Sequence, residues 1–593
     1  MKPKTAKVLL SLLVAGYFCW AAVGQAAAQG RWTTLPYLMP INPIHMALMN
    51  NGQVLIVAGS GYDATVTNFE AAVWDPRTGT ISRQSLGWDM FCNGMVVLPD
   101  GRVFINGGNL QYHPFRGEPR NSVFDPTTGQ FTDLENMAHG RWYPTVTTLG
   151  DGSVMTFSGL SETGSTNSTV EIYRVGSGWS PEYESGWIPP LYPRMHLVPD
   201  GNVFASGPMA ETMTFDTASK TWFGVASTNY NRMRTYGSSV LLPLSPADGY
   251  KARVMIFGGA DPATATTEII DLSAATPQWQ YGPPMSQPRI EMNATILPNG
   301  TVLALGGSAN DEDASTASLN ADLYDPDTNT FSSAGANAFP RLYHSNSLLL
   351  ADGTVAVLGG NPLQGMYEPH IEIYSPAYLF NADGSLATRP RITGVAGAIA
   401  YGSAFQVQTP NAADIASVVL VRPGSPTHAF DQDQRLVRLS YNAGSGVLNV
   451  TAPPTGNIAP PGYYMLFVLS SAGVPSTASF VRLTADFSLS ATPASQTVLP
   501  GGSTSYTATV AAGTGPTGAV AFSVSGLPSG ATAAFTPASV NGSGSTTMRV
   551  ATSLTTPLGT YPLTIIASGG GLVRREAVTL TVGASVMTMP GLP

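Results

Sequence analysis

Seven segments of the chain repeat one order of apolar and polar positions. Each has an apolar stretch, an Asp-Gly or Asn-Gly turn, a second apolar stretch and then small glycine-rich residues, as in PDGRVFINGG from Pro99. Both central residues of a type I′ turn need positive φ, so these dipeptides between apolar stretches predict β-hairpins. The fifth copy, from Tyr250, lacks the dipeptide there and has Asp248-Gly249 just before it. The turn residues of the other copies are Asn51, Asp100, Asp151, Asp200, Asn299 and Asp352.

The hairpins recur about every fifty residues, and each is followed by a second signature such as VWDPRTG at Val73 or LYDPDTN at Leu323. A four-stranded unit with this period is typical of kelch repeats, so seven copies predict a seven-bladed kelch-type β-propeller over residues 35–381. Closing the ring would leave few sheet edges exposed. A β-solenoid or a string of β-sandwiches is the alternative, and the period disfavours both because solenoid repeats are shorter and sandwiches longer.

The pattern changes after the last repeat. Segments such as FQVQT at Phe405 and YYMLFVL at Tyr463 predict a β-sandwich over residues 385–485. A composition rich in Ser, Thr and Ala begins near Asp486. Its recurring strands predict a second, immunoglobulin-like β-sandwich over residues 486–583, followed by a tail over residues 584–593. We therefore expect an all-β protein, in which the last sandwich serves as a spacer or an adhesive module.

Composition and charge narrow the classes of function. Of the 593 residues 43% are hydrophobic and 11% are charged, which excludes a charged disordered chain and a coiled coil. The formal net charge of −9 argues against nucleic acid as a partner, because phosphate binding needs a basic face.

The N-terminus has the composition of a targeting segment. Lys2, Lys4 and Lys7 precede an apolar run from Val8, and small residues follow up to Ala28. This pattern predicts a signal peptide over residues 1–28 and a secreted protein, extracellular or periplasmic. The alternative is a membrane anchor, which we disfavour because the run is shorter than the ~20 residues of a span. No later segment is long enough to span, so we expect no transmembrane segment after signal removal.

The cysteine count limits the chemistry of the exported chain. The two cysteines are Cys19 and Cys92, and Cys19 leaves with the predicted signal peptide. The exported protein would then have one cysteine and no internal disulfide. A lone cysteine in an oxidising compartment is either buried and inert or used chemically, and the frequent burial of cysteine by itself favours the first.

The repeat places several reactive side chains at one height along the predicted propeller axis. Counting back eight positions from the turn residue reaches Cys92, Tyr143 and His344 in three copies, with Tyr343 one residue before His344. Imidazole and phenolate groups that converge suit copper. The same position in other copies is occupied by Pro43, Tyr192 and Glu291. The histidines without a phased partner, which we expect to be structural or on the surface, are His45, His113, His139, His196 and His370.

Four segments resemble the metal-site signatures of the copper radical oxidases, the family that includes galactose oxidase and glyoxal oxidase. They are DMFCNGMVVLPDG at Asp89, GRWYPTVTTLGDG at Gly140, RLYHSNSLLLADG at Arg341 and SPTHAFDQDQRLVRL at Ser425. They occur in the family's order. The stretches EIYSPAYL at Glu372 and PPGYYMLFVLSSAGVPS at Pro460 are also similar to the family. The resemblance covers about residues 35–485 and leaves the last sandwich outside it.

The resemblance implies a role for each matching residue. Cys92 would be joined through sulfur to the ring of Tyr143, which would bind copper and hold a radical. Tyr343 would be the axial ligand that takes the substrate's hydroxyl proton. His344 and His428 would supply the two imidazole ligands, so a loop of the first sandwich must reach the axis. The resemblance also implies one copper ion, no organic cofactor, and the reduction of O2 to hydrogen peroxide.

The substrate is less closely defined than the site. The segment Arg141-Trp142-Tyr143-Pro144 resembles the glyoxal oxidase side of the family, and Leu160-Ser161-Glu162 stands where galactose oxidase has a tryptophan stacked over the cross-link. One role for Trp142 is to shield the radical. Neighbours along a strand point to opposite faces, so we expect instead that Trp142 packs within its blade. Arg234 and Tyr236 are candidates for the mouth of the site.

Two classes of function follow from these patterns. The first is a secreted copper radical oxidase, a monomer, that acts on a small aldehyde or primary alcohol, with carbohydrate and cell-surface glycans among the candidate substrates. The second is a carbohydrate-binding or adhesive propeller without turnover, which has no need for the set of Cys92, two tyrosines and two histidines. Hydrolysis lacks a phased carboxylate pair, since Glu291 is the only phased carboxylate.

Overall fold

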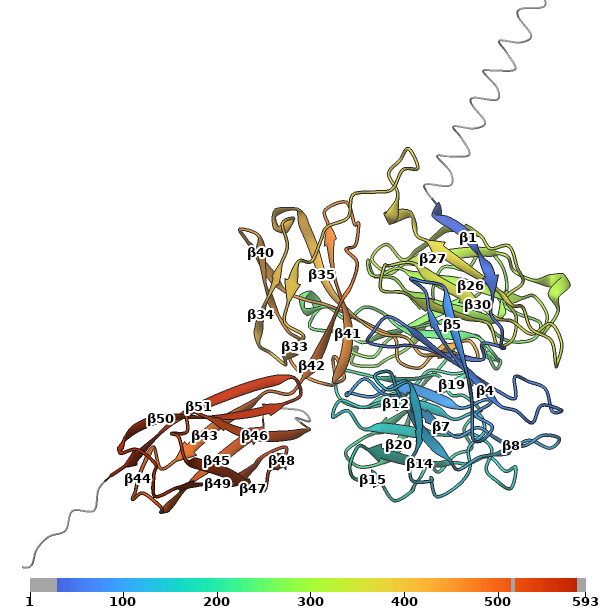
Figure 1. Ribbon diagram of the computed structural model, residues 1–593. Helices are drawn as coiled ribbons and strands as arrows, with labels where there is room; N and C mark the ends of the chain where they lie inside the picture. Colours follow the sequence, from blue (N-terminus) through green and yellow to red (C-terminus); the bar gives the residue numbers. More distant parts are fainter. Residues whose placement is uncertain (1–28, 513–517, 584–593) are drawn as a thin grey trace, which may run out of the picture. The chain divides into compact units, whose positions relative to one another are not determined.

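Figure 1 shows the computed structural model, which describes residues 29–512 and 518–583. The described chain forms two compact units. The first comprises the residues up to Val395 with Ala404–Pro453 and Asn457–Val481, and the second comprises Ala396–Ser403, Pro454–Gly456 and the residues from Arg482. The predicted signal peptide and tail lie outside the described residues. Among these residues, no helix has the length and apolarity needed to cross a membrane.

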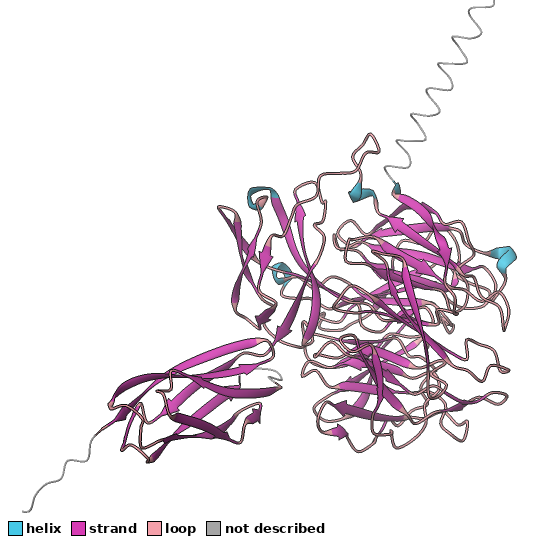
Figure 2. Cartoon of the chain, viewed as in Figure 1, coloured by secondary structure: helices cyan, strands magenta, loops and turns pink. Residues whose placement is uncertain are grey.

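Strands dominate both units (Figure 2), which confirms the prediction of an all-β protein. The many Gly-containing turns and β-branched residues favour short strands over helices. Short 3₁₀ turns lie between the strands at Pro246–Asp248, Ala314–Thr316, Ala377–Leu379 and Ala412–Asp414.

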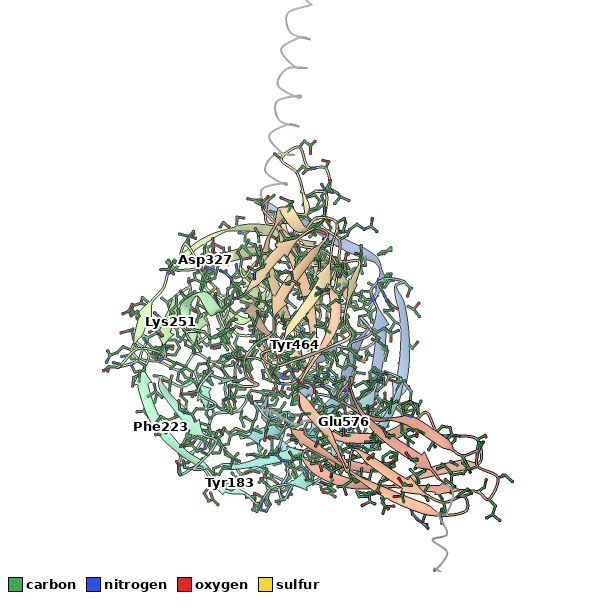
Figure 3. The ribbon with its side chains drawn as sticks, turned by 90° about the vertical axis from the view of Figure 1, so that its left-hand side faces the viewer. Tyr183, Phe223, Lys251, Asp327, Tyr464 and Glu576 are labelled. Carbon is green, nitrogen blue, oxygen red and sulfur yellow. The ribbon has the colours of Figure 1, made fainter. Side chains whose placement is uncertain are left out.

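Seven sheets make up most of the first unit, and each holds one of the seven sequence repeats. We call them blades 1 to 7. The innermost strands of neighbouring blades pack side by side. Blade 4 meets blade 5 where His196 Nε2 and Ser239 Oγ lie 2.8 Å apart, so the blades close a ring (Figure 3).

Blades 1 to 4 follow the order of the chain, each a meander of antiparallel strands. Blade 1 is β2 (His45–Leu48), β3 (Val54–Gly59), β4 (Glu70–Asp75) and β5 (Thr80–Ser85). Blade 2 is β6 (Gly94–Val97), β7 (Val103–Asn106), β10 (Asn121–Asp125) and β11 (Gln130–Asp133). Blade 3 is β12 (Thr145–Thr148), β13 (Val154–Phe157), β14 (Thr169–Arg174), β15 (Gly178–Trp179) and β16 (Tyr183–Glu184). Blade 4 is β17 (Met195–Leu197), β18 (Val203–Ala205), β19 (Glu211–Asp216) and β20 (Thr221–Ser227).

The remaining blades complete the ring, and the last joins both ends of it. Blade 5 is β21 (Ser238–Leu241), β22 (Arg253–Phe257), β23 (Thr267–Asp271) and β24 (Trp279–Tyr281). Blade 6 is β25 (Ile290–Ile296), β26 (Val302–Ser308), β27 (Asn320–Asp325) and β28 (Thr330–Ala336). Blade 7 is β29 (Asn346–Leu349), β30 (Val355–Leu358), β31 (His370–Ser375) and, as its outer strand, β1 (Arg31–Leu38).

After the ring, the chain forms two further sheets and then enters the second unit. One sheet is β32 (Gly394–Val395), β34 (Ala404–Gln408), β40 (Val447–Thr451) and β39 (Tyr441–Gly444). Another sheet is β33 (Ala398–Ala400), β42 (Ser479–Thr484), β41 (Gly462–Ser470), β35 (Ile415–Arg422) and β38 (Arg435–Arg438). Two small hairpins are β8 (Asn109–Gln111) with β9 (Arg116–Gly117), and β36 (Pro426–Thr427) with β37 (Phe430–Asp431).

Most of the second unit is a sandwich of two sheets. One is β43 (Phe487–Thr492), β45 (Ser503–Ala512), β49 (Gly544–Thr552) and β47 (Ala531–Thr536). The other is β44 (Ser495–Val498), β51 (Leu572–Val582), β50 (Gly559–Gly569), β46 (Ala519–Ser525) and β48 (Ser539–Asn541). Its core consists of alternating inward residues, which include Tyr506, Met548 and Leu580 in one cluster and Phe487 and Val520 in another.

Candidate metal centre

Five of the residues at the phased position, all but Pro43, have an unusual backbone at or just before the innermost strand of their blades. Non-glycine residues rarely have positive φ, and such residues gather at functional sites. The φ angle is 62° at Cys92, 69° at Tyr143, 44° at Tyr192, 63° at Glu291 and 63° at His344. In blade 5, Tyr236 has φ 48° and takes the equivalent place.

Backbone hydrogen bonds connect these kinked residues from one blade to the next. Tyr143 N donates to Cys92 O at 3.0 Å, and Tyr192 N donates to Tyr143 O at 3.0 Å. Glu291 N donates to Tyr236 O at 2.9 Å. At blade 7 the acceptor is a side chain and not a backbone carbonyl, because Tyr343 N donates to Oε2 of Glu291 at 3.1 Å. The blades therefore hold one another's phased residues in fixed register.

His428 comes from the loop between β35 and β38, which enters the ring. Gln432 Oε1 accepts from Val146 N in blade 3 at 3.0 Å, and Asp433 Oδ2 accepts from Val97 N in blade 2 at 2.9 Å. Gln434 Oε1 accepts from the backbone N–H of Ile296 in blade 6 at 2.9 Å, and Thr427 Oγ1 donates to the carbonyl of Ile44 beside blade 1 at 3.0 Å. These bonds fix the loop, and His428 with it, at the axis.

The predicted site residues lie together and are buried. Ligand atoms of Cys92, His344 and His428 lie within 4.8 Å of one another, and Cys92 Sγ is 3.5 Å from His428 Nε2. The ring centroid of Tyr343 is 3.7 Å from that of His344, and the ring centroid of Tyr143 is 4.7 Å from that of His428. At most 6% of any of these side chains is exposed. Thiol, phenol and imidazole groups thus meet at one buried point.

Hydrogen bonds fix the tautomers of both imidazoles. His344 Nδ1 lies 2.7 Å from Asn361 Oδ1, which also accepts from Asn42 Nδ2 at 3.1 Å. Because Asn361 Oδ1 only accepts, His344 carries its proton on Nδ1 and keeps a lone pair on Nε2. Among the described residues this Nε2 has no hydrogen-bond partner. The Thr427 hydroxyl donates to a carbonyl, so it accepts from His428 Nδ1–H at 2.6 Å and leaves the His428 Nε2 lone pair available.

The protonation states suit a metal. Burial lowers the pKa of His344 to about 3. Burial, followed by the neighbouring His344, His45 and Arg194, lowers the pKa of His428 well below its ordinary value. Both rings are therefore neutral at physiological pH, as metal ligation requires. Imidazole oriented by a second hydrogen bond, beside phenol and thiol, is a donor set that fits copper.

Trp142 packs on Tyr143, so the expectation that it would only pack within its blade is wrong. The two ring centroids lie 3.8 Å apart with planes 16° apart, and Phe115 stacks on Trp142 at 4.2 Å. The alternation rule fails here because β12 starts only at Thr145 and Tyr143 has φ 69°. Neighbours outside an extended strand need not face opposite sides.

Arg234 and Tyr236, the two residues expected at the mouth of the site, lie in different surroundings. Arg234 is buried, with its guanidinium 2.8 Å from Glu268, so its assignment to the mouth is wrong. Several such ion pairs join the start of a blade to its third strand. The pair of Arg141 with Glu171 is another example. Tyr236 does reach the site, where its hydroxyl lies 3.5 Å from that of Tyr343.

Two aromatic side chains of the site escaped the sequence analysis because they lie on loops without a repeat phase. The ring of Tyr62 is 5.6 Å from Tyr343 and 5.0 Å from His344. Burial, with nearby Glu312, raises the pKa of Tyr62 to about 12. Tyr112 stacks on Phe91, and its hydroxyl lies 2.8 Å from Ser60 Oγ. Aromatic side chains thus surround the buried cluster.

One of the unphased histidines also lies near the cluster. His45 is fully buried, its Nε2 accepts from Asn93 N at 3.3 Å, and its ring is 5.7 Å from that of His428. Its contact with the residue after Cys92 agrees with the structural role expected for it. The signal that could have found it is its place two residues after the phased Pro43.

Comparisons with known proteins agree with this geometry. The family described as "Glyoxal oxidase N-terminus" matches residues 62–378, and "Galactose oxidase-like, Early set domain" matches residues 389–483. The chain is 28% identical over 495 residues to galactose oxidase of Gibberella zeae, covering 77% of this chain and 71% of that protein. It is 30% identical over 462 residues to aldehyde oxidase GLOX of Vitis pseudoreticulata, covering 70% of this chain and 85% of that protein.

A solved structure shares the fold. It is described as a novel fungal alcohol oxidase with catalytic diversity among the AA5 family, in complex with copper. The TM-score is 0.67 at 25% identity, over 77% of this chain and 99% of that one.

Proposed function

Because the chain belongs to the glyoxal oxidase and galactose oxidase family, we propose that it is a copper-dependent oxidase of small aldehydes or primary alcohols that reduces O2 to hydrogen peroxide. One observation carries the proposal: the ring of blades and the loop of the first sandwich bring one buried set of donors together. That set is Cys92, Tyr143, Tyr343, His344 and His428.

The side chains that would hold copper are Tyr143, Tyr343, His344 and His428. A copper ion there supplies a one-electron acceptor beside an oxidisable phenol, which together match a two-electron oxidation. The lone pairs on His344 Nε2 and His428 Nε2 are the available imidazole donors, since both Nδ1 atoms carry protons. Copper in the related solved structure supports this choice of metal.

The protein-derived group is the second part of the proposal. A thioether between Cys92 and Tyr143 donates electron density into the phenol ring and lowers its oxidation potential. The stacked indole of Trp142 covers that ring and excludes water from it. The lone described cysteine, which is free and buried, then has a chemical use.

The chain's own residues have distinct tasks in the proposed reaction. The oxygen of Tyr343 accepts the proton of the substrate hydroxyl, and the oxidised ring of Tyr143 takes a hydrogen atom from the substrate carbon. For an alcohol the balance is RCH2OH + O2 giving RCHO + H2O2. The aromatic side chains of Tyr62, Tyr112 and Tyr236 restrict the size of the substrate.

Export, the oligomeric state and the substrate class also belong to the proposal. Export follows from the predicted signal peptide, and we expect a monomer. The substrate class on the glyoxal oxidase side rests on the segment Arg141-Trp142-Tyr143-Pro144 and on the named aldehyde oxidase relative. A binding or adhesive propeller is the competing function, and it gives the buried donors no task.

Peptide mass spectrometry of the copper-treated protein tests the proposal. The expected result is a Cys92–Tyr143 cross-linked peptide that has lost two hydrogens, together with peroxide release on addition of aldehydes or alcohols. Cys92→Ser is the matched control, because it keeps the size of the side chain and cannot form the thioether. A free Cys92 thiol after exposure to copper and O2 would favour the competing function.

A further inference from the structure

Tyr192 is a second aromatic side chain that packs against Tyr143, and the mechanism above gives it no task. Its ring centroid lies 4.5 Å from that of Tyr143 and 4.6 Å from that of His428. Tyr143 and His428 are themselves 4.7 Å apart, so the three rings form a nearly equilateral triangle. One side chain from blade 4 thus contacts a residue of blade 3 and the loop of the first sandwich together.

The polar groups of Tyr192 connect it to the third partner, the turn that carries Cys92. The Tyr192 hydroxyl donates to Asn93 O at 2.6 Å, and Asn93 directly follows Cys92. The Tyr192 amide donates to Tyr143 O at 3.0 Å. Burial, followed by the neighbouring Cys92, raises the pKa of Tyr192, which keeps the phenol protonated and able to donate.

The backbone of Tyr192 has a conformation that disfavours a side chain there. Its φ of 44° lies in the left-handed region, and only 3% of the residue is exposed. A bulky residue in this region is strained, and strain of this kind persists where the surroundings hold it. The strained backbone directs the phenol toward Asn93, Tyr143 and His428 at once.

We propose that Tyr192 is a positioning residue that holds the ring of Tyr143 against Cys92 while the thioether forms. This inference rests on the proposed function. In the step, the Cys92 S–H bond and one ring C–H bond of Tyr143 break and one S–C bond forms. The two electrons and two protons pass to O2, which leaves as hydrogen peroxide.

The rate of thioether formation tests the proposal. Full-length copper-free protein is mixed with Cu²⁺ and O2, and the loss of two hydrogens is followed by mass spectrometry. Tyr192→Phe keeps the ring and removes the bond to Asn93, and loss of a buried hydrogen bond predicts a rate about fivefold lower. Tyr192→Leu also removes the ring contacts, and we expect a rate more than about tenfold lower.

Tyr506→Phe is the matched control. Tyr506 is also buried, and its hydroxyl donates to Thr579 O at 2.7 Å in the core of the second unit. This variant loses the same kind of hydrogen bond, so we expect the wild-type rate. The copper content of every sample distinguishes slow cross-linking from weak copper uptake. A slow rate fully explained by missing copper overturns the proposal.

The outcomes separate the two hypotheses. If the wild-type protein does not cross-link, the proposed function itself fails. If it cross-links and both Tyr192 variants match Tyr506→Phe, Tyr192 only fills space and the inference fails. Tyr192→Phe is nearly isosteric, so its rate decides the matter even where Tyr192→Leu does not fold.

Discussion

The indole ring of Trp142 lies flat on the phenol ring of Tyr143, with centroids 3.8 Å apart and planes 16° apart. Phe115 stacks in turn on Trp142 at 4.2 Å, and its plane is 12° away. The residue to which the family resemblance assigns the radical therefore belongs to a column of aromatic rings. Trp142 and Tyr143 stack although they are adjacent, because positive φ at Tyr143 brings both side chains to the same side.

Replacing Trp142 tests whether the column protects an oxidised Tyr143. We expect Trp142→Leu to shorten the lifetime of the radical by up to about tenfold, because an aromatic pair contributes ~0.5–1.5 kcal/mol beyond burial. The decay of the radical absorption after oxidation measures this. Trp187→Leu, in a ring cluster with Phe157 and Trp222, is the control. Equal lifetimes in both variants would contradict a protective role.

Removal of His428 tests the metal site. We expect His428→Ala to lower copper affinity more than about hundredfold, since loss of a ligand should exceed the ~10–100-fold cost of losing its supporting bond. Isothermal titration of the copper-free protein with Cu²⁺ measures the affinity. His139→Ala removes a partly exposed histidine beside Glu162 and should bind copper normally. Unchanged binding in His428→Ala would eliminate the proposed ligand set.

The bond from His344 to Asn361 gives a subtler test. Asn361→Leu leaves His344 Nδ1 without its acceptor, so the imidazole loses its fixed tautomer and we expect copper affinity to fall about 10–100-fold. Asn361→Asp keeps an acceptor at that place and should retain more of the affinity. The same titration compares them, and an equal loss in both variants would argue that shape alone matters.

The periodic part of the site could be predicted from the sequence. Asp-Gly and Asn-Gly turns mark six of the seven hairpins, and a fixed distance back from them reaches Cys92, Tyr143 and His344. The distance works because six of the seven blades enter their innermost strand through the same left-handed kink, and only blade 1, with Pro43 at that place, does not. His428 has no such phase, since it comes from a loop of another sheet pair, and only the family resemblance pointed to it.

The rules of regular secondary structure gave wrong positions for Trp142 and Arg234. They also could not identify Tyr62 and Tyr112 as residues near the site. Alternation along a strand assumed that Trp142 was already extended, three residues before β12 begins. Arg234 looked available because its carboxylate partner, Glu268, lies on a different strand of the blade. Tyr62 and Tyr112 lie on loops whose path depends on tertiary contacts, which no local pattern encodes.

The loop that carries His428 depends on a buried ion pair. Arg422 Nε donates to Asp433 Oδ1 at 2.6 Å, and both side chains are at most 3% exposed. Asp433→Asn leaves a buried guanidinium without its charge partner, so we expect the free energy of unfolding to fall by about 3–5 kcal/mol, with weaker copper binding. Urea denaturation measures the first effect.

An exposed pair supplies the control for this substitution. Arg438 and Asp327 are 2.9 Å apart, with 32% and 61% of their side chains exposed. Asp327→Asn should change stability by less than about 1 kcal/mol, as exposed pairs do. A similar small effect from Asp433→Asn would show that the loop does not depend on the buried pair.

His196 makes stability depend on pH at a place remote from the copper chemistry. Its Nε2 lies 2.8 Å from Ser239 Oγ between blades 4 and 5. Burial, followed by the charge of Arg435, lowers its pKa to about 3. In the unfolded chain the pKa returns to about 6.5, so below that pH the unfolded state binds one proton more. The contribution of His196 to the free energy of unfolding is fully present above pH 6.5 and is lost as the pH falls toward 3.

The expected size follows from about 1.4 kcal/mol per pH unit, or about 2 kcal/mol between pH 7 and pH 5. His196→Gln cannot take up this proton, and its amide can still bond Ser239. The stability difference between wild type and His196→Gln should therefore shift by about 2 kcal/mol in favour of the variant at pH 5. Urea denaturation of copper-free protein at both pH values measures it. A difference independent of pH would mean that His196 takes up its proton in the fold as readily as in the unfolded chain.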